Sequence, residues 1–195
     1  MKKLIAIVGA IIMATAVKAQ INVGANFLIG VPSGEWNDPA FVSTGLGGGI
    51  EGNYFVIEDQ LSVGLEVGFL SFSEKEEGFP ISMTATPIII KGEYYFLDDA
   101  FRPFVGLGIG YYLVNMKVTT PAIPGFVEEM TTTTAANGMG ISPRIGASYQ
   151  ATDLIAVVLN FNYNLLFGQK ADGEALDNAT NWIGIGIGAR FTIQD

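Results

Sequence analysis

The chain has 195 residues, of which 49% are hydrophobic and 15% charged, and its formal net charge is −9. It contains neither cysteine nor histidine, so it has no disulfide framework and lacks the commonest general base and the commonest metal ligand. The acidic balance argues against a basic surface for nucleic acid. We therefore expect no catalytic residues, no metal site, no cofactor and no nucleic-acid partner.

The first residues have the pattern of an export signal. Lys2 and Lys3 precede an apolar run over residues 4–17, and Val17-Lys18-Ala19 forms a small-residue cleavage site. A membrane anchor needs roughly 20 apolar residues, which is more than this run offers. We predict a cleavable signal peptide over residues 1–19 and one domain over residues 20–195, with seven basic and nineteen acidic residues left.

The domain reads as eight segments in which side chains alternate in character. In the segment 101–113, Val105 and Leu107 alternate with Gly106 and Gly108, which is the period of a β-strand. A strand with one wet face would carry polar residues there, whereas here glycines suit a crowded interior. The eight predicted strands cover residues 21–31, 44–56, 61–72, 81–96, 101–113, 138–150, 154–167 and 183–193.

The connections between these segments alternate in length. Long ones cover residues 32–43, 73–80, 115–137 and 168–180, and short ones lie at 57–60, 97–100 and 151–153. Outer-membrane barrels have an even number of strands, short periplasmic turns and longer outer loops. Because an unpaired edge is costly in hydrocarbon, the sheet must close. The sequence therefore predicts an all-β fold, an eight-stranded antiparallel up-and-down transmembrane β-barrel.

The charged residues of the predicted strands fall on the glycine-bearing face, which a barrel turns toward its lumen. They are Glu51, Glu66, Lys91, Glu93, Arg102, Arg144 and Arg190. A turn centred on residues 58–59 places Glu51 opposite Glu66, and two carboxylates at that distance need a cation. We predict Arg144 as the partner across the lumen, with Lys91 as the nearer alternative.

A second group of Glu93, Arg102 and Arg190 is predicted closer to the periplasmic end. Two interpretations of these charges stay open. They are either polar fillers that neutralise one another, or a gate whose rearrangement opens a small conductance.

The outer loops carry the remaining candidate residues, Trp36, Phe41 and Phe126. The segment 115–137 is long enough for the fifth and sixth strands to project above the membrane. These loops are either simply solvated, or they recognise a partner through an exposed β-rich edge or bind lipopolysaccharide through divalent cations.

A glycine-rich segment and two prolines within the predicted strands need separate interpretation. Residues 47–52, GGGIEG, have the spacing of a dinucleotide-binding loop, but that loop must open a helix and here a strand continues. Pro103 and Pro143 cannot donate to a ladder, so we expect them near strand beginnings or bulges.

The segments RPFVGLGIGYY, PIIIKGEYYF and GIGIGARFTI resemble the small outer-membrane β-barrel family of Gram-negative bacteria, which includes OmpX and the OmpA transmembrane domain. Similarity to OmpA implies a lumen ion-pair cluster, to which Glu51, Lys91 and Arg144 correspond by type. Two departures stand out. No peptidoglycan-binding domain follows, which argues against a periplasmic tether, and the sequence ends FTIQD without a terminal aromatic residue.

From these features we expect a non-enzymatic outer-membrane protein with a structural or surface-interaction role, in adhesion or envelope integrity. The alternative is a narrow channel for ions or small apolar solutes, similar to OmpW-like barrels, and the third interpretation is a soluble ligand-binding barrel. The expected partners are outer-membrane lipid, lipopolysaccharide, the barrel-assembly machinery and periplasmic chaperones, and we expect a monomer.

Overall fold

A computed structural model of the chain describes residues 20–33, 43–74, 81–120, 122, 130–171, 174–175 and 180–193. The predicted signal peptide, residues 1–19, lies outside this part of the chain. The described residues form β-strands, turns and bends. Their strands are β1 (Ile21–Ser33), β2 (Gly45–Ile57), β3 (Leu61–Glu74), β4 (Ile81–Tyr95), β5 (Phe101–Thr120), β6 (Met130–Gln150), β7 (Ile155–Ala171), β8 (Glu174–Ala175) and β9 (Asn181–Ile193).

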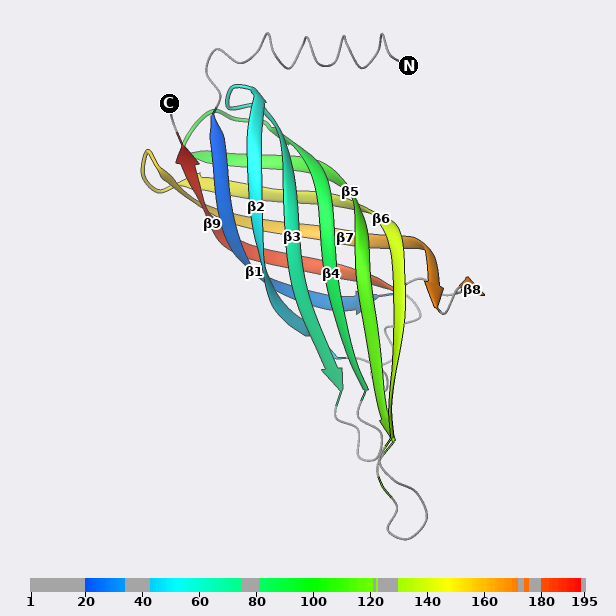
Figure 1. Ribbon diagram of the computed structural model, residues 1–195. Coiled ribbons are helices and arrows are strands. Elements are labelled where there is room, and N and C mark those ends of the chain that lie inside the picture. The colour runs from blue at the N-terminus through cyan, green and yellow to red at the C-terminus, as the bar shows by residue number, and fades with distance from the viewer. Residues whose placement is uncertain are drawn as a thin grey trace, which may run out of the picture.

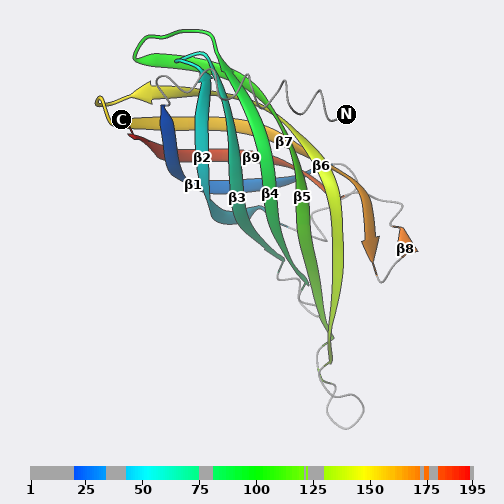
Figure 2. The same ribbon diagram turned by 45° about the horizontal axis from the view of Figure 1, so that its top comes forward.

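Eight of these strands close into an antiparallel barrel, as Figures 1 and 2 show. Each strand from β1 to β7 pairs with its sequence neighbour, and β9 pairs with both β7 and β1. The two-residue strand β8 adds only to the end of β7. The predicted fold class and all eight wall strands are confirmed, whereas β8 was not predicted. The described residues contain no helix long and apolar enough to cross a membrane.

The two ends of the barrel differ in their connections. Turns at 58–60, 96–100 and 151–154 join strands at one end, which we call the short-turn end. The other four connections lie at the opposite, long-loop end, where β5 and β6 extend furthest (Figure 1). The predicted alternation of short and long connections is therefore confirmed.

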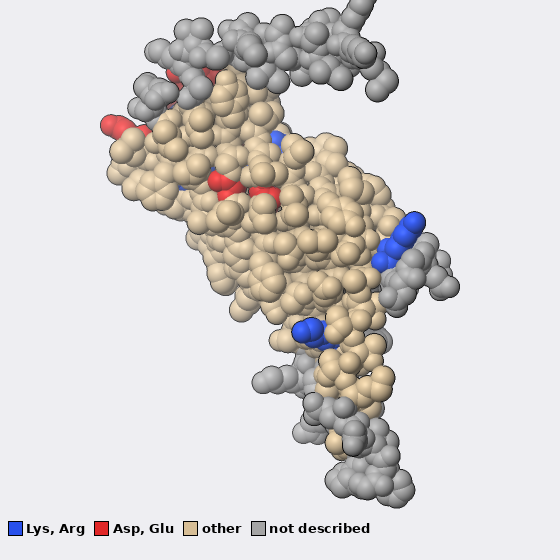
Figure 3. All heavy atoms as spheres, in the orientation of Figure 1, with Lys and Arg blue, Asp and Glu red and all other residues tan. Residues whose placement is uncertain are grey.

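The apolar face of the wall points outward. Ile50 is 65% exposed and Ile90 is 70% exposed, and Leu107 and Ile109 on β5 are more than half exposed. Aromatic residues such as Tyr149 are exposed near the short-turn end as well. Uncharged residues cover most of the wall on the face that Figure 3 shows. A surface of this kind suits hydrocarbon and not water, as the alternation in the sequence predicts.

The connection predicted over residues 115–137 is shorter than expected. Strand β5 continues to Thr120 and β6 begins at Met130, and the two stay paired from Asn115↔Ala135 to Thr120↔Met130. Hydrophobic alternation is weak there, because Met116 and Val118 keep it on β5 but residues 131–134 of β6 are four threonines. The threonines nevertheless favour an extended backbone, since they are β-branched.

The two prolines behave differently from each other. Pro103 is the third residue of β5, near the strand beginning, as expected. Pro143 lies inside β6, where the ladder to β7 lacks pairs at Ser142 and Pro143 although the register on either side is the same. The expectation of a strand beginning or bulge at Pro143 is therefore wrong. The barrel tolerates the missing donor as a local gap in one ladder.

Candidate functional site in the barrel lumen

Six charged side chains meet in the middle of the lumen, and we call them the ion cluster. They come from five strands: Glu51 on β2, Glu66 on β3, Lys91 and Glu93 on β4, Arg144 on β6 and Arg190 on β9. All six occupy inward positions of the period-two pattern and are at least nine-tenths buried. Three carboxylates balance three cations, so the cluster is formally neutral.

Lys91 is the centre of the ion cluster. The β2–β3 register places Glu51 directly opposite Glu66, which is the predicted repulsive pair. Lys91 Nζ contacts Glu51 Oε2, lies 3.0 Å from Glu93 Oε1 and lies 3.3 Å from Glu66 Oε2. One ammonium group therefore contacts all three carboxylates. Together with Arg144 and Arg190 it balances their charge, which relieves the repulsion between neighbours on adjacent strands.

Arg190 closes the opposite side of the ion cluster. Its Nε donates to Glu51 Oε1 at 2.6 Å and its Nη2 to Glu51 Oε2 at 3.1 Å, a bidentate pair. Nη2 also lies 3.1 Å from Glu93 Oε2. Nη1 donates to the Tyr95 hydroxyl, which itself donates to Glu93 Oε2 at 2.8 Å. This fork fixes β9 to β2 and β4 across the lumen.

Arg144 pairs with Glu66 across the lumen, as the sequence analysis expected. The distance from Arg144 Nη1 to Glu66 Oε2 is 2.8 Å, and the distance to Glu93 Oε1 is 3.7 Å. Gly106 and Gly108 leave the room for this side chain, because a Cβ at Gly106 would lie 2.9 Å from Arg144 Cγ. Arg144 therefore reaches Glu66 past the inward glycines of β5.

Arg102 does not belong to the ion cluster. Its Nη1 lies 2.7 Å from Asp59 Oδ1, and its Nε donates to the Asp99 carbonyl at 3.1 Å, both at the short-turn end. In the predicted second group of Glu93, Arg102 and Arg190, the pairing of Glu93 with Arg190 is therefore confirmed, whereas the inclusion of Arg102 and a group separate from Lys91 are wrong. Lys91 and Glu93 are successive inward residues of β4, so their long side chains reach one site, whereas Arg102 is only the second residue of β5.

Apolar side chains fill the lumen on both sides of the ion cluster. Toward the short-turn end, Phe55, Tyr95, Phe104 and Val158 pack together, with ring centroids of Tyr95 and Phe104 5.2 Å apart. The group toward the long-loop end is larger, and we call it the apolar plug. It consists of Leu28, Leu70, Phe72, Met83, Ala85, Ile89, Tyr112, Val114, Ala136, Leu166 and Trp182.

The sequence analysis missed the apolar plug, because it considered only the glycines and the charged residues of the inward face. Trp182 is 1% exposed and packs edge-on against Tyr112, with centroids 5.5 Å apart. The sequence did contain a signal for the apolar plug, since Phe72 and Val114 are apolar residues at inward positions of the period-two pattern. A cavity of only about 20 Å³ lies between the ion cluster and this plug, lined by Glu66, Asn162 and Trp182 among others.

A ladder of amides runs along β7 beside the ion cluster. Asn164 Nδ2 donates to Asn162 Oδ1 at 2.8 Å, and the Tyr112 hydroxyl donates to Asn164 Oδ1 at 3.0 Å. Gly186 on β9 makes room for this ladder, because a Cβ there would lie 2.6 Å from Asn160 Nδ2. The alternation of asparagine and glycine in the sequence therefore reflects packing between neighbouring strands.

A bulge at Gly168 turns one more polar side chain into the lumen. Gly168 has φ +62°, and the β6–β7 register shifts at Asn137–Met139. As a result Gln169 is buried, donates to the Ala136 carbonyl at 2.9 Å and accepts from the Thr180 amide at 2.6 Å. Gln169 thereby connects β6 and Thr180 to β7 at the long-loop end.

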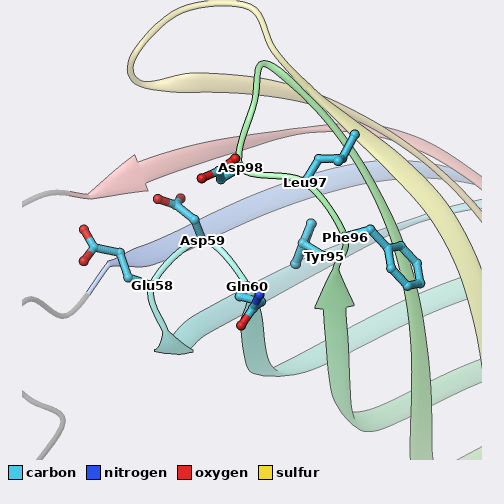
Figure 4. A pocket seen from close by; sticks show the side chains of 7 residues that line it. All are labelled: Glu58, Asp59, Gln60, Tyr95, Phe96, Leu97 and Asp98. Atoms are coloured by element: carbon cyan, nitrogen blue, oxygen red, sulfur yellow. The ribbon is translucent and has the colours of Figure 1, made fainter.

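A pocket of about 420 Å³ opens at the short-turn end (Figure 4). It lies between the β2–β3 and β4–β5 turns, and its lining includes the carboxylates of Glu58, Asp59 and Asp98. Among the described residues no group of three acidic side chains has the arrangement of a metal site. The loop candidates Trp36, Phe41 and Phe126 lie outside the described residues.

The closed antiparallel wall, its apolar outer face and its buried, balanced charges define the class of protein as a small transmembrane β-barrel. The sequence matches the family described as outer membrane protein beta-barrel domain over residues 4–191. The chain belongs to this family, and the predicted resemblance is confirmed. No curated protein sequence matches the chain significantly.

Solved structures of outer-membrane proteins share the fold at low sequence identity. A major outer membrane protein from Thermus thermophilus is 14% identical with a TM-score of 0.65, covering 90% of this chain and 99% of that one. OprG from Pseudomonas aeruginosa is 13% identical (TM-score 0.57, 91% and 97% covered). Neisserial surface protein A is 15% identical (TM-score 0.56, 90% and 97% covered). The family assignment supports an outer-membrane location.

Proposed function

We propose that the protein acts at the cell surface by binding an extended segment of a partner to the edge of β6. The observation that carries this proposal is the projecting hairpin, formed by residues 115–120 of β5 and 130–135 of β6. Its strands are paired with each other, whereas the β6–β7 ladder begins only at Ala136↔Ala171. Beyond that pair, β6 has no partner on its other side among the described residues.

The projecting hairpin stands clear of the barrel. Thr131, Thr132 and Thr133 are all exposed, so both faces of β6 are open to solvent there. Figures 1 and 2 agree that β7 and β8 bend away from this part of β6. Strand β5 differs from β6, because β4 covers its other edge as far as Ile81↔Val118.

The free edge lacks the features that normally protect such strands. Natural edges carry charges, prolines or bulges that prevent pairing with another chain. Residues 130–135 read MTTTTA, which contains neither a charge nor a proline. Strand addition obtains its affinity from main-chain hydrogen bonds and accepts varied side chains. The edge of β6 therefore suits an extended segment of neutral or basic character.

The sequence of the four long connections favours a basic over an acidic partner. Residues 34–42, 75–80, 121–129 and 172–179 contain nine carboxylates and one lysine. Neisserial surface protein A is named as a surface protein, in keeping with a surface role for this fold. Lipopolysaccharide, bridged through divalent cations, is proposed as the lipid partner of these acidic loops.

Shortening the hairpin tests the surface role. Replacing residues 116–134 by Asn-Gly joins Asn115 to Ala135, which already face each other in the register. Cells that display this variant should bind immobilised host matrix less than cells with the full chain, at equal surface amounts. Replacing Thr131 and Thr133 by serine keeps the backbone edge and should leave binding unchanged. Equal binding by all three cell types would reject the surface role.

A second candidate function is a gated, narrow channel, and the shared carboxylates favour it. Glu66 contacts both Lys91 and Arg144, and Glu93 lies within 4 Å of Lys91, Arg144 and Arg190, so the pairs can exchange without leaving a charge alone. Planar-bilayer recording of the purified protein beside Arg144→Ala tests this candidate. A conductance that the substitution alters supports the gate, and silent traces from both proteins reject it.

We further propose export by the signal peptide, assembly by periplasmic chaperones and the barrel-assembly machinery, and a monomeric state in the membrane. We assign no enzymatic reaction to the protein. Mass spectrometry of the chain isolated from membranes tests the export step, since the mature protein should begin at Gln20. Retention of residues 1–19 would contradict cleavage.

A further inference from the structure

The two faces of the projecting hairpin differ in polarity. Tyr112 and Val114 of β5 are buried in the lumen, and in a strand every second side chain points to the same side. This period and the registers to β4 and β6 identify the residues that continue the lumen side beyond the barrel. We call them the inner face, and they are Ile81, Met116, Val118, Met130, Thr132 and Thr134.

The inner face is apolar and open. Four of its six side chains are apolar, whereas the opposite side carries serine, threonine, asparagine, one lysine and only Ala135 as an apolar residue. Met130 is 64% exposed, and Ile81, Met116 and Val118 are half-buried. An antiparallel sheet commonly has one face packed and one solvated, so an apolar face that is left open marks a surface for a partner.

The inner face adjoins the free edge of β6. Val118 lies between Ile81 on β4 and Thr132 on β6 in the registers of the hairpin. A strand added to β6 would therefore lie beside Thr132, about 10 Å from Val118. Threonine is short, so a longer side chain of the added strand reaches across it to Val118. Met130 is at the edge itself, so the hydrogen-bonding edge and the apolar surface meet in one place.

On the basis of the proposed binding to the β6 edge, we propose that the partner segment is an amphipathic β-strand, whose apolar side chains occupy every second position and pack on the inner face. Since the side-chain period of a strand is two, one set of side chains lies on this face whichever direction the partner runs. Main-chain hydrogen bonds accept varied sequences, whereas Met116, Val118 and Met130 favour apolar side chains on their side. Methionine is flexible, so the inner face accepts apolar side chains of different shapes.

The other side chains of the partner should be polar. They would lie beside Thr131 and Thr133, which point away from the inner face and are exposed. Thr119 Oγ1 and Thr131 Oγ1 are 3.2 Å apart, so the hydroxyls on this side already form a hydrogen bond between strands. Polar side chains of an added strand can extend this pattern. The preference for a neutral or basic segment therefore applies to this side alone.

Two synthetic peptides of equal composition test the pattern. Val-Ser-Val-Lys-Val-Ser-Val-Lys places all its valines on one side of a strand, whereas Val-Val-Ser-Lys-Val-Val-Ser-Lys divides them equally between both sides. Fluorescence anisotropy with the protein in lipid nanodiscs, and with empty nanodiscs as the blank, should show about tenfold tighter binding of the alternating peptide, because its isomer buries fewer valines. Equal affinities would overturn the alternating pattern and leave binding to the edge intact. Absence of binding by both peptides would overturn the pattern and the edge together.

Substitutions on opposite faces identify the side that selects the peptide. Val118→Thr combined with Met130→Thr removes apolar surface from the inner face and keeps residues that favour an extended backbone. This double variant should lose most of the preference for the alternating peptide, whereas Lys117→Thr on the opposite face should keep it. A preference that survives in the double variant would overturn the inner face as the recognising surface. Weaker peptide binding at higher protein concentration would identify a second copy of the chain as the occupant and would also overturn the proposal.

Discussion

Replacing Arg190 by methionine should destabilise the barrel strongly, whereas the same replacement of Arg102 should not. Arg190 makes two hydrogen bonds to Glu51 and pairs with Glu93, and its side chain is 3% exposed. Methionine keeps much of the volume but leaves two buried carboxylates to share Lys91. Removing one partner of a buried pair costs about 3–5 kcal/mol.

Arg102 provides the matched control because it makes one ion pair outside the ion cluster. Its side chain is 15% exposed and that of Asp59 is 34% exposed. The pair is therefore partly solvated, and its contribution should be about 1 kcal/mol, which is nearer the ~0–1 kcal/mol of exposed pairs than the contribution of the ion cluster. The free energy of unfolding is measured by urea titration in lipid vesicles, followed by the fluorescence of the buried Trp182. Equal losses for Arg190→Met and Arg102→Met would refute the claim that burial makes the ion cluster important for stability.

Further substitutions test the packing and the orientation of the wall with the same urea titration. Gly186→Ala should cost about 1–3 kcal/mol because its Cβ would lie 2.6 Å from Asn160 Nδ2, whereas Gly52→Ala, with no atom within 4 Å, should stay within about 0.5 kcal/mol. Gly168→Ala should cost about 1–2 kcal/mol through its backbone alone, since its φ is +62° and the space around it is open; no loss would contradict the bulge. Ile90→Lys should cost about 2–4 kcal/mol in a bilayer because Ile90 is on the outer face, and a neutral result would speak against contact with lipid.

The sequence predicted the wall because alternation and connection length are local properties. Segments such as 101–113 carry large apolar residues on every second position, and this pattern fixes which face is outward before any contact is known. The same dependence on a local pattern explains why the extensions of β5 and β6 were not predicted. The strands continue past Asn115 and Ala135, where the four threonines at 131–134 of β6 give no alternation of apolar and polar residues.

The ion cluster was only partly predictable. The opposition of Glu51 and Glu66 follows from counting residues around a short turn, and the structure has this register. Glu93 and Arg190 belong to the same cluster as Lys91 because their long side chains reach one site in the lumen. Strand order alone does not determine how far a side chain reaches. The apolar plug was missed for a related reason, because Phe72 and Trp182 meet only after the barrel closes.

The orientation of the two faces is the central claim, and spin labels in a lipid bilayer measure it directly. The chain contains no cysteine, so Ile90→Cys and Ser142→Cys each provide one labelling site, on the outer face and in the lumen respectively. A label at Ile90 should collide readily with oxygen, which dissolves in lipid, and rarely with a water-soluble nickel complex, whereas a label at Ser142 should collide rarely with both. Nickel access at Ile90 together with oxygen access at Ser142 would contradict an apolar face turned to lipid and charges enclosed within.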